Sequence, residues 1–271
     1  MKLHYLNCAA MFPRCAKWGA PHLSRVPTHC ILLEKEKELV LIDTGLGTRD
    51  MADLSRLGPT NLLLNARPDL ADTAIDQIEK RGLDPADVRH IICTHLHSDH
   101  AGGLVDFPQA RVHVLRQEFE AMTHPSGMIE RGVYRKKQVE HGPRWVLHDE
   151  SEISNETWFG MPCIRNIPDL PPEIVLVPLI GHTRGHCGVA IDTGEKWVLH
   201  CGDAYYVNAE LGKGAPIDVA CFTAMVHHDR FQALGQVKRI KRVLEENQGL
   251  VRPVCTHDHS QYQELFGRVL A

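Results

Sequence analysis

The chain has 271 residues and a formal net charge of −4, with 43% hydrophobic and 24% charged residues. This composition is typical of a globular protein, and the length suits one large domain or two small ones. The acidic balance and the lack of a basic block argue against a nucleic-acid partner. No apolar stretch is long enough for a transmembrane helix, so we expect no membrane partner either.

The first eight residues, MKLHYLNC, lack the apolar run of a signal peptide, which predicts a cytoplasmic protein. The nine cysteines contain no Cys-x-x-Cys pair, which disfavours a disulfide framework and a thiolate zinc site. The 18 histidines are the unusual feature of the composition. Histidine is the commonest metal ligand among side chains, so the positions of these residues matter.

The first half of the chain predicts strands and helices in alternation. Short apolar runs at 30–33 and 39–42, on either side of a charged turn, predict a β-hairpin. Apolar residues at helical spacing predict a helix over 69–81, which Gly82 ends. The other elements predicted in this half are strands at 88–93 and 111–115 and a short helix at 116–122.

Residues 123–172 differ from the rest of the chain. They hold six prolines and two of the four tryptophans, and their periodicity is poor. This pattern predicts an irregular, lid-like insertion within one domain that spans residues 1–271. Seven large side chains in or beside the segment are candidates for the wall of a substrate pocket: Met122, Met128, Tyr134, Trp145, Trp158, Phe159 and Met161.

Regular elements return after this segment. Apolar residues between 231 and 244 suit an amphipathic helix. Strands are predicted at 174–180, 189–192, 197–200 and 251–255. Strands and helices therefore alternate in both halves, which predicts an α/β or α+β fold built in layers.

A histidine-rich motif, His95-x-His97-x-Asp99-His100, directly follows the predicted strand at 88–93. Residues two apart in an extended segment point to the same side, so His95 and His97 are expected to converge on one metal ion. If the chain then turns into a helix, Asp99 and His100 are redirected toward a second position nearby. The glycines at 102–103 would allow the backbone to make this turn.

Three more potential ligands each follow a predicted strand: His182 in a Gly-His-Thr sequence, Asp203 in a Gly-Asp sequence, and His257 in a Thr-His sequence. Loops at strand ends cluster in α/β sites, so we expect these side chains to meet. Residues 92–97 (ICTHLH) also resemble residues 254–259 (VCTHDH). This echo favours two similar half-sheets that deliver ligands to one site, with chance similarity as the alternative.

On these motifs, the sequence over about residues 28–259 resembles the metallo-β-lactamase superfamily. The resemblance implies a four-layer αββα sandwich, in which two sheets stack face to face between helices. It implies a site at one edge of the sandwich with two divalent ions. The implied ligands are His95, His97 and His182 for the first ion, Asp99, His100 and His257 for the second, and Asp203 as a bridge between both.

Further roles follow from the same resemblance. Asp43 resembles the family's strand-end aspartate, which would orient a ligating histidine through its free ring nitrogen, with a turn cap as the alternative. His186 is expected beside the ligands rather than among them, and His259 is the alternative ligand to His257. The segment from Asp203 to Tyr206 is similar to the Asp-Ala-x-Tyr of acyl-homoserine lactonases, where the tyrosine contacts the substrate carbonyl or ring oxygen. A packed aromatic is the alternative for Tyr206.

These observations predict a dinuclear metal-dependent hydrolase that attacks the carbonyl of a lactone or ester with a metal-bound hydroxide, since bound metal lowers the pKa of water toward about 7. Asp99, Asp203 and Tyr206 are the predicted catalytic residues. Zn²⁺ is the expected ion, with Fe, Mn or Co as alternatives. The open alternatives for the activity are a mononuclear-iron redox enzyme resembling sulfur dioxygenases, a thioesterase, and a metal-binding protein without turnover. The expected partners are a small-molecule substrate and a second copy in a homodimer.

Overall fold

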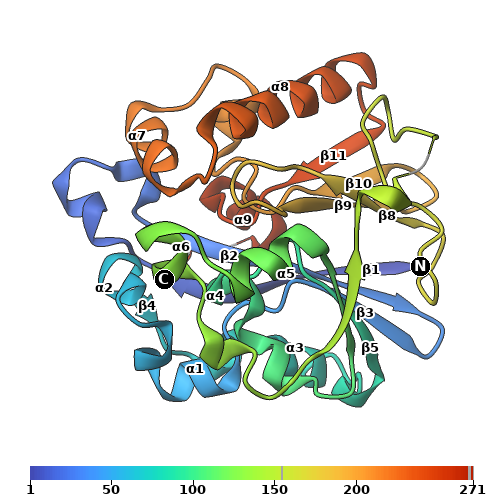
Figure 1. The fold of residues 1–271 in the computed structure, drawn as a ribbon, viewed down its shortest axis with the longest axis horizontal. Coiled ribbons are helices and arrows are strands. Elements are labelled where there is room, and N and C mark those ends of the chain that lie inside the picture. Colours follow the sequence, from blue (N-terminus) through green and yellow to red (C-terminus); the bar gives the residue numbers. More distant parts are fainter. Residues whose placement is uncertain (154, 268–269, 271) are drawn as a thin grey trace.

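The structure is a computed structural model that describes residues 1–153, 155–267 and 270. Two β-sheets stack face to face, and helices cover their outer faces (Figure 1). The larger sheet has seven strands in the order β4-β1-β2-β3-β5-β6-β7, and the smaller has four in the order β11-β10-β9-β8. This arrangement confirms the predicted αββα sandwich.

The larger sheet combines an antiparallel and a parallel half. Strands β1, β2 and β3 pair antiparallel, while β3, β5, β6 and β7 run parallel to one another. Parallel strands end at the same edge of a sheet, so the loops after β3 and β5 lie together. The strands span Lys2–Met11 (β1), Val26–Lys35 (β2), Glu38–Ile42 (β3), Ala66–Arg67 (β4), Val88–Ile92 (β5), Arg111–Leu115 (β6) and Arg144–His148 (β7).

In the smaller sheet, β8, β9 and β10 pair antiparallel and β10 runs parallel to β11. The parallel pair again brings two carboxyl ends to one edge. The strands span Ile174–Pro178 (β8), Cys187–Asp192 (β9), Trp197–His200 (β10) and Val251–Val254 (β11).

Three apolar layers hold the sandwich together. In β2, Ile31 and Leu33 pack between the two sheets, whereas Cys30 and Leu32 pack under helices on the outer face. Because both faces of the strand are covered here, residues 30–33 form a continuous apolar run rather than an alternating one. On the other side of the molecule, α8 covers the smaller sheet with residues such as Ile240.

The helices vary widely in length. Helix α8 is the longest and matches the predicted amphipathic helix. Their bounds are Thr48–Ala52 (α1), Thr60–Leu64 (α2), Ala74–Glu79 (α3), Ser98–Ala101 (α4), Arg116–Thr123 (α5), Gly127–Val133 (α6), Ile217–Val226 (α7), Arg230–Glu246 (α8) and His259–Phe266 (α9). None of the helices in the described part of the chain is long and apolar enough to cross a membrane.

Several elements differ from the predictions. The helix predicted over 69–81 is a 3₁₀ turn, Leu70–Asp72, followed by α3, because the Thr73 hydroxyl accepts a hydrogen bond from the Asp76 backbone N–H and starts a new helix there. Strand β1 and helix α7 were not predicted.

The segment 123–172 is less irregular than its prolines suggest. It contains α6 and also β7, which extends the larger sheet beside β6. The lid-like role of the rest of this segment stays a prediction.

Candidate metal centre

The predicted ligands come from the ends of strands in both sheets. His95 and His97 follow β5, and His97 is the N-cap residue of the short helix α4, which carries Asp99 and His100. From the smaller sheet, His182 lies between β8 and β9. The remaining two ligands, Asp203 and His257, follow β10 and β11.

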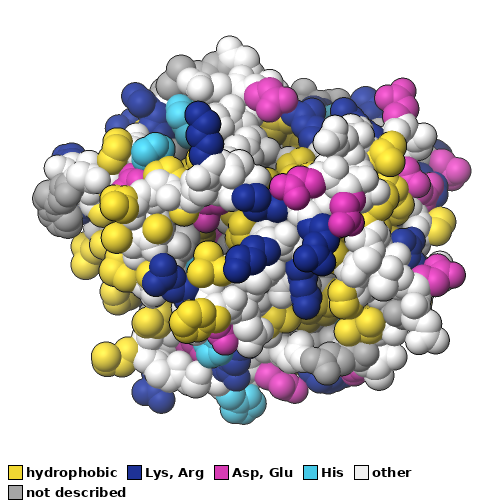
Figure 2. All heavy atoms as spheres, turned by 90° about the horizontal axis from the view of Figure 1, so that it is seen from above, with side chains coloured by type: hydrophobic (Ala, Val, Ile, Leu, Met, Phe, Trp, Pro, Cys, Tyr) yellow, Lys and Arg dark blue, Asp and Glu magenta, His cyan; other side chains and the backbone are white. Residues whose placement is uncertain are grey.

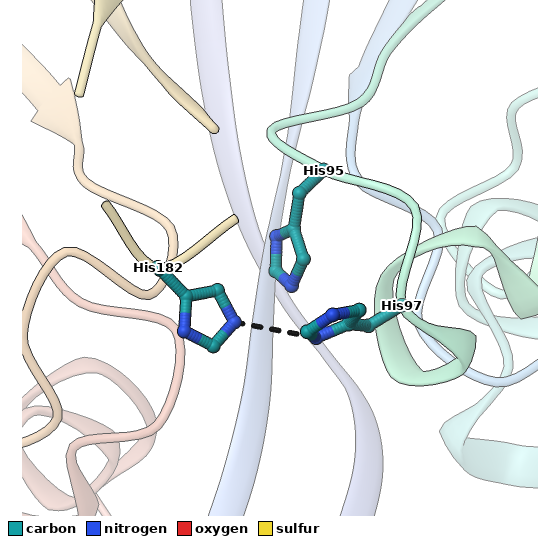
Figure 3. Close-up of side chains that lie close together, drawn as sticks. All are labelled: His95, His97 and His182. Atoms are coloured by element: carbon teal, nitrogen blue, oxygen red, sulfur yellow. Dashed lines mark hydrogen bonds between the residues drawn. The ribbon is translucent and has the colours of Figure 1, made fainter. Parts of the chain in front are cut away.

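Three histidines form the first cluster. The rings of His95, His97 and His182 point toward one another, His182 from one loop and the other two from a second loop (Figure 3). His182 Nε2 lies 3.2 Å from His97 Nδ1, and the ring centroids of His95 and His182 are 4.8 Å apart. The three side chains can each offer one nitrogen to the same ion.

A second cluster lies beside the first, and Asp203 lies between them. Asp99, His100 and His257 can offer one ligand atom each to a common ion. Asp203 Oδ2 is 3.4 Å from His182 Nε2 of the first cluster and 3.2 Å from His257 Nε2 of the second. Asp203 Oδ1 is 3.3 Å from His100 Nε2. The structure therefore brings all seven predicted ligands together.

The donor set fits metal ions. Buried polar atoms are nearly always hydrogen-bonded, yet among the described residues Nε2 of His95 is buried without a hydrogen-bond partner, and Nε2 of His100 and Oδ1 of Asp203 face each other without forming a hydrogen bond. Ligands about 2.0–2.1 Å from a tetrahedral zinc ion lie about 3.3 Å from one another. The separations of 3.2–3.4 Å around Asp203 match this spacing.

The electrostatics of the first cluster favour neutral imidazole, which is the form that binds metal. Burial lowers the pKa of His97 to about 4 and holds the pKa of His95 and of His182 well below the usual value. These rings therefore present free nitrogen lone pairs at neutral pH.

Three carboxylates lie close to His100 of the second cluster. Burial opposes the charged form of His100, but Asp203, Asp43 and Asp99 outweigh it and raise the pKa of His100 well above its usual value. Burial likewise opposes ionisation of Asp203, but the neighbouring histidines hold the pKa of this carboxyl well below its usual range. The surroundings thus favour a positive charge at this position, which a bound cation would supply.

Asp43, for which the sequence predicts an orienting role, contacts the ring of His100. Its Oδ2 lies 2.9 Å from His100 Nδ1, and both oxygens also accept hydrogen bonds from Thr94, at 2.8 Å each. The backbone of Asp43 is left-handed, with φ of 54°. This turn directs the carboxylate under the His95–His100 loop, and the side chain is fully buried.

His186 lies behind Asp203 and His182. Its Nε2 accepts a hydrogen bond from the Asp203 backbone N–H at 2.9 Å, and its Nδ1 donates to the Leu179 carbonyl at 3.0 Å. A Cβ atom at Gly202, whose φ is +53°, would lie 2.4 Å from this Nε2. The glycine before Asp203 is therefore required both by its backbone conformation and by the close approach of His186.

Tyr206 lies at the site rather than in remote packing. Its hydroxyl donates a hydrogen bond to Asp203 Oδ2 at 3.0 Å. Burial, together with the negative charge of Asp203, raises the pKa of Tyr206 well above its usual value, so the phenol stays protonated. The ring stacks beside His257, with 5.4 Å between centroids.

A cavity opens onto the two clusters. Its floor contains His97, Asp99, His182, Asp203, Tyr206 and His257. Its wall is largely apolar and includes Leu23, Leu63, Ile129, Val133, Phe222 and Val226. Apolar side chains continue onto the surface around it, and Figure 2 shows them gathered on the side where α2, α6 and α7 lie in Figure 1.

This wall is not the one predicted from the sequence. Trp158 and Met161 are buried under the smaller sheet, and Met122 is buried under the larger one. Among the seven candidates, Met128 and Tyr134 border a second cavity, which also opens onto His97 and His182. The main wall comes instead from short helices far apart in the sequence, which no local pattern connects.

Two residues of the site were not predicted. Glu118 on α5 is fully buried and accepts four hydrogen bonds: from the backbone N–H groups of Leu96 and Gly185 and from the hydroxyls of Thr183 and Tyr134. It therefore joins the His95–His97 loop to the His182 loop. The other residue is His227, whose Nδ1 lies 3.1 Å from His182 Nδ1.

Comparisons with known proteins point to one family. The sequence pattern described as the metallo-beta-lactamase superfamily matches residues 23–162. A protein of Mycobacterium tuberculosis named probable metallo-hydrolase is 37% identical over 265 residues, which are 97% of this chain and 82% of that relative. An N-acyl homoserine lactonase of Bacillus thuringiensis is 27% identical over 250 residues, which are 91% of this chain and 86% of the relative.

Solved structures share the fold. An N-acyl homoserine lactone hydrolase with the product N-hexanoyl-L-homoserine at its catalytic metal centre has a TM-score of 0.72 and 22% identity, over 99% of this chain and 98% of that one. AidC, a dizinc quorum-quenching lactonase, has a TM-score of 0.63 and 15% identity, over 95% and 89% of the two chains. The relatives confirm the prediction of a metal-dependent hydrolase. The chain belongs to the metallo-beta-lactamase superfamily.

Proposed function

We propose that this protein is a dinuclear metal-dependent hydrolase that opens a lactone or cleaves an ester. The observation that carries the proposal is the position of Asp203, whose carboxylate lies within 3.4 Å of a histidine of each cluster. A carboxylate in this place can bridge two ions. The ion of one cluster would be held by His95, His97 and His182, and the ion of the other by Asp99, His100 and His257.

Charge supports hydrolytic chemistry at this site. Two divalent ions bring four positive charges, and the carboxylates of Asp99 and Asp203 offset two of them, while the five histidines are neutral as ligands. When bound, the ions would acidify water and polarise the substrate carbonyl. The chain itself holds two of the proposed ligands in fixed positions. His186 fixes the backbone of Asp203, and Asp43 fixes the ring of His100.

Tyr206 is the proposed hydrogen-bond donor to the substrate. Its hydroxyl is protonated, lies 3.0 Å from Asp203 Oδ2 and borders the cavity, so a small rotation turns it toward a carbonyl or ring oxygen. A donor at this position would stabilise negative charge that develops on that oxygen. The lactonases among the relatives favour a lactone as the substrate of such a donor.

The apolar wall of the cavity favours a substrate with a hydrocarbon part. Leu63, Ile129 and Phe222 offer no charged group to a substrate, whereas the floor offers the candidate ligands and the Tyr206 hydroxyl. The related structure with N-hexanoyl-L-homoserine holds a product of this kind. We therefore propose an acyl lactone or aryl ester as the small-molecule substrate.

Zn²⁺ is the proposed ion because imidazole nitrogen with carboxylate oxygen is a common zinc donor set. Iron, manganese and cobalt also accept these donors. The cytoplasmic location and the homodimer stay predictions.

Elemental analysis of the purified protein, combined with a panel of acyl lactones, aryl esters and thioesters, tests the proposal. We expect two divalent ions per chain and faster hydrolysis of lactones or esters than of thioesters, with activity lost on chelation and restored by Zn²⁺. One iron per chain with oxygen consumption on a persulfide would instead favour the redox alternative. Thioester cleavage alone would favour a thioesterase, and two bound ions without any turnover would contradict the hydrolase.

A further inference from the structure

The outer nitrogens of the predicted histidine ligands have distinct partners. A ligating histidine usually donates its second ring N–H to a carboxylate, a backbone carbonyl or water, and this fixes the ring. His100 follows the rule, with Nδ1 at 2.9 Å from Asp43. His257 also follows it, with Nδ1 donating to the Pro27 carbonyl at 2.7 Å.

His182 has a different partner, because its Nδ1 lies 3.1 Å from Nδ1 of His227. His182 Nε2 points into the cluster, 3.2 Å from His97. If Nε2 binds an ion, the ring proton of His182 must be on Nδ1 and is donated to His227. His227 then accepts through Nδ1 and carries its own proton on Nε2. We propose that His227 is the positioning residue of His182 and sets the affinity of the His95–His97–His182 cluster for its ion.

The backbone around His227 is built to hold this contact. The N–H of His228 donates to the His182 carbonyl, and the N–H of Asp229 donates to the Gly181 carbonyl, both at 2.9 Å. These two bonds fix the segment after α7 against the His182 loop. The rings of His182 and His227 meet edge to face, with 5.2 Å between centroids and an interplanar angle of 86°.

The same segment forms part of the substrate wall. Phe222 and Val226, on the last turns of α7, line the apolar cavity, and His227 lines the second cavity next to His182. Helix α7 also packs against Tyr206: the ring centroids of Phe222 and Tyr206 are 5.2 Å apart. A substrate in either cavity would therefore contact helix α7 or the residues directly after it, the segment that carries His227.

This inference rests on the proposed function, since it needs an ion at the first cluster. The test uses four variants of the full-length protein: His227→Leu, His227→Asn, His227→Gln and His228→Leu. Asn places an amide oxygen where Nδ1 of histidine lies, whereas Gln places its amide near Nε2. His228 is the matched control, because its side chain instead lies 3.3 Å from Glu130. Co²⁺ affinity is measured for each ion by absorption titration against a competing chelator.

We expect His227→Leu and His227→Gln to lower the Co²⁺ affinity of one of the two sites by about tenfold or more. The affinity of the other site should not change. His227→Asn should keep the affinity of both sites near that of the unmodified protein, and His228→Leu should do the same. Circular dichroism checks folding, and the Asn and Gln pair still decides the matter if the Leu variant does not fold.

Two results would overturn the role of His227: unchanged Co²⁺ affinity in the Gln variant, or equal losses in the Asn and Gln variants. Failure of the unmodified protein to bind two ions would be a separate outcome, because it would remove the proposed dinuclear site itself.

Discussion

Asp43 and His100 form a fully buried hydrogen bond of 2.9 Å although they are 57 positions apart in the sequence. The bond joins the end of β3 to helix α4 and leaves only Nε2 of His100 facing the cluster. Asp43 therefore acts on the site through the ring that it holds.

We predict that Asp43→Asn weakens metal binding by about 10- to 100-fold, because an amide is a weaker acceptor for the His100 ring proton than a carboxylate. Competition with a chromophoric chelator measures the change. Asp53→Asn is the control, since Asp53 is an exposed helix cap that asparagine can replace. Equal affinities of the Asp43 variant and the unmodified protein would contradict the orienting role.

Asp203→Ala should abolish turnover and lower the metal content while leaving a folded chain. The substitution removes the only carboxylate that lies within 3.4 Å of histidines of both clusters among the described residues. Activity assays, elemental analysis and circular dichroism measure the three effects. Full activity in this variant would disprove the bridge.

Tyr206→Phe should slow lactone opening by about tenfold or more, which corresponds to about 1.4 kcal/mol of transition-state stabilisation. The metal content should not change, because the Tyr206 hydroxyl is a donor to Asp203 rather than a ligand. The neighbouring Tyr205→Phe is the control, since Tyr205 is buried in the core beneath α8. If steady-state kinetics show no difference between the two variants, Tyr206 is only a packed aromatic.

Glu118→Ala should lower the free energy of unfolding by roughly 3 kcal/mol or more, because it leaves four buried donors without an acceptor. It should also lower the metal affinity of the His95–His97–His182 cluster, because the Glu118 carboxylate holds together the two loops that carry these histidines. Urea denaturation measures the first effect and metal titration the second. Glu120→Ala, an exposed position on the same helix, should change neither.

A row of three buried histidines predicts a pH effect remote from the site. His113 Nε2 lies 2.9 Å from His90 Nδ1, and His113 Nδ1 lies 3.0 Å from His148 Nε2. Burial, with His148 and His90 as further causes, lowers the pKa of His113 to about 3. Between about pH 6.5 and 3, the unfolded chain binds a proton here that the folded chain does not, so stability falls as the pH falls.

His113→Gln should remove part of this pH dependence, by up to about 1.4 kcal/mol per pH unit within that window. Urea denaturation at a series of pH values, with equal metal content in both proteins, measures the difference in slope. Parallel curves for the variant and the unmodified protein would show that His113 is not the titrating group.

The strands of the core could be predicted because each is a short apolar run between turns. Strand β1 was missed because residues 2–11 mix apolar residues with His4 and Asn7, and its pairing with β2 supplies the burial. Helix α7 was missed because apolar residues occur on all sides of it, and Ile217 and Met225 remain exposed. Strand β7 was hidden among prolines, and its contact with β6 is what makes it a strand.

The seven candidate ligands could be singled out from the sequence because they occur in short motifs at strand ends. Glu118 and His227 could not, because each is a single residue without a motif. Glu118 reaches Leu96 across 22 positions, and His227 reaches His182 across 45. Only the packing of α5 and of the segment after α7 brings these side chains to the loops that they support.

The candidate ligands are divided between the two halves of the sandwich, with four after β5 and three from loops of the smaller sheet. A pair of cations bound there would cross-link the two halves, since the halves could not separate without releasing the ions. Resistance to unfolding would then rise with the supply of free ion, by about 1.4 kcal/mol for each tenfold excess over the dissociation constant. Metal starvation would thus threaten the persistence of the folded protein as well as its turnover.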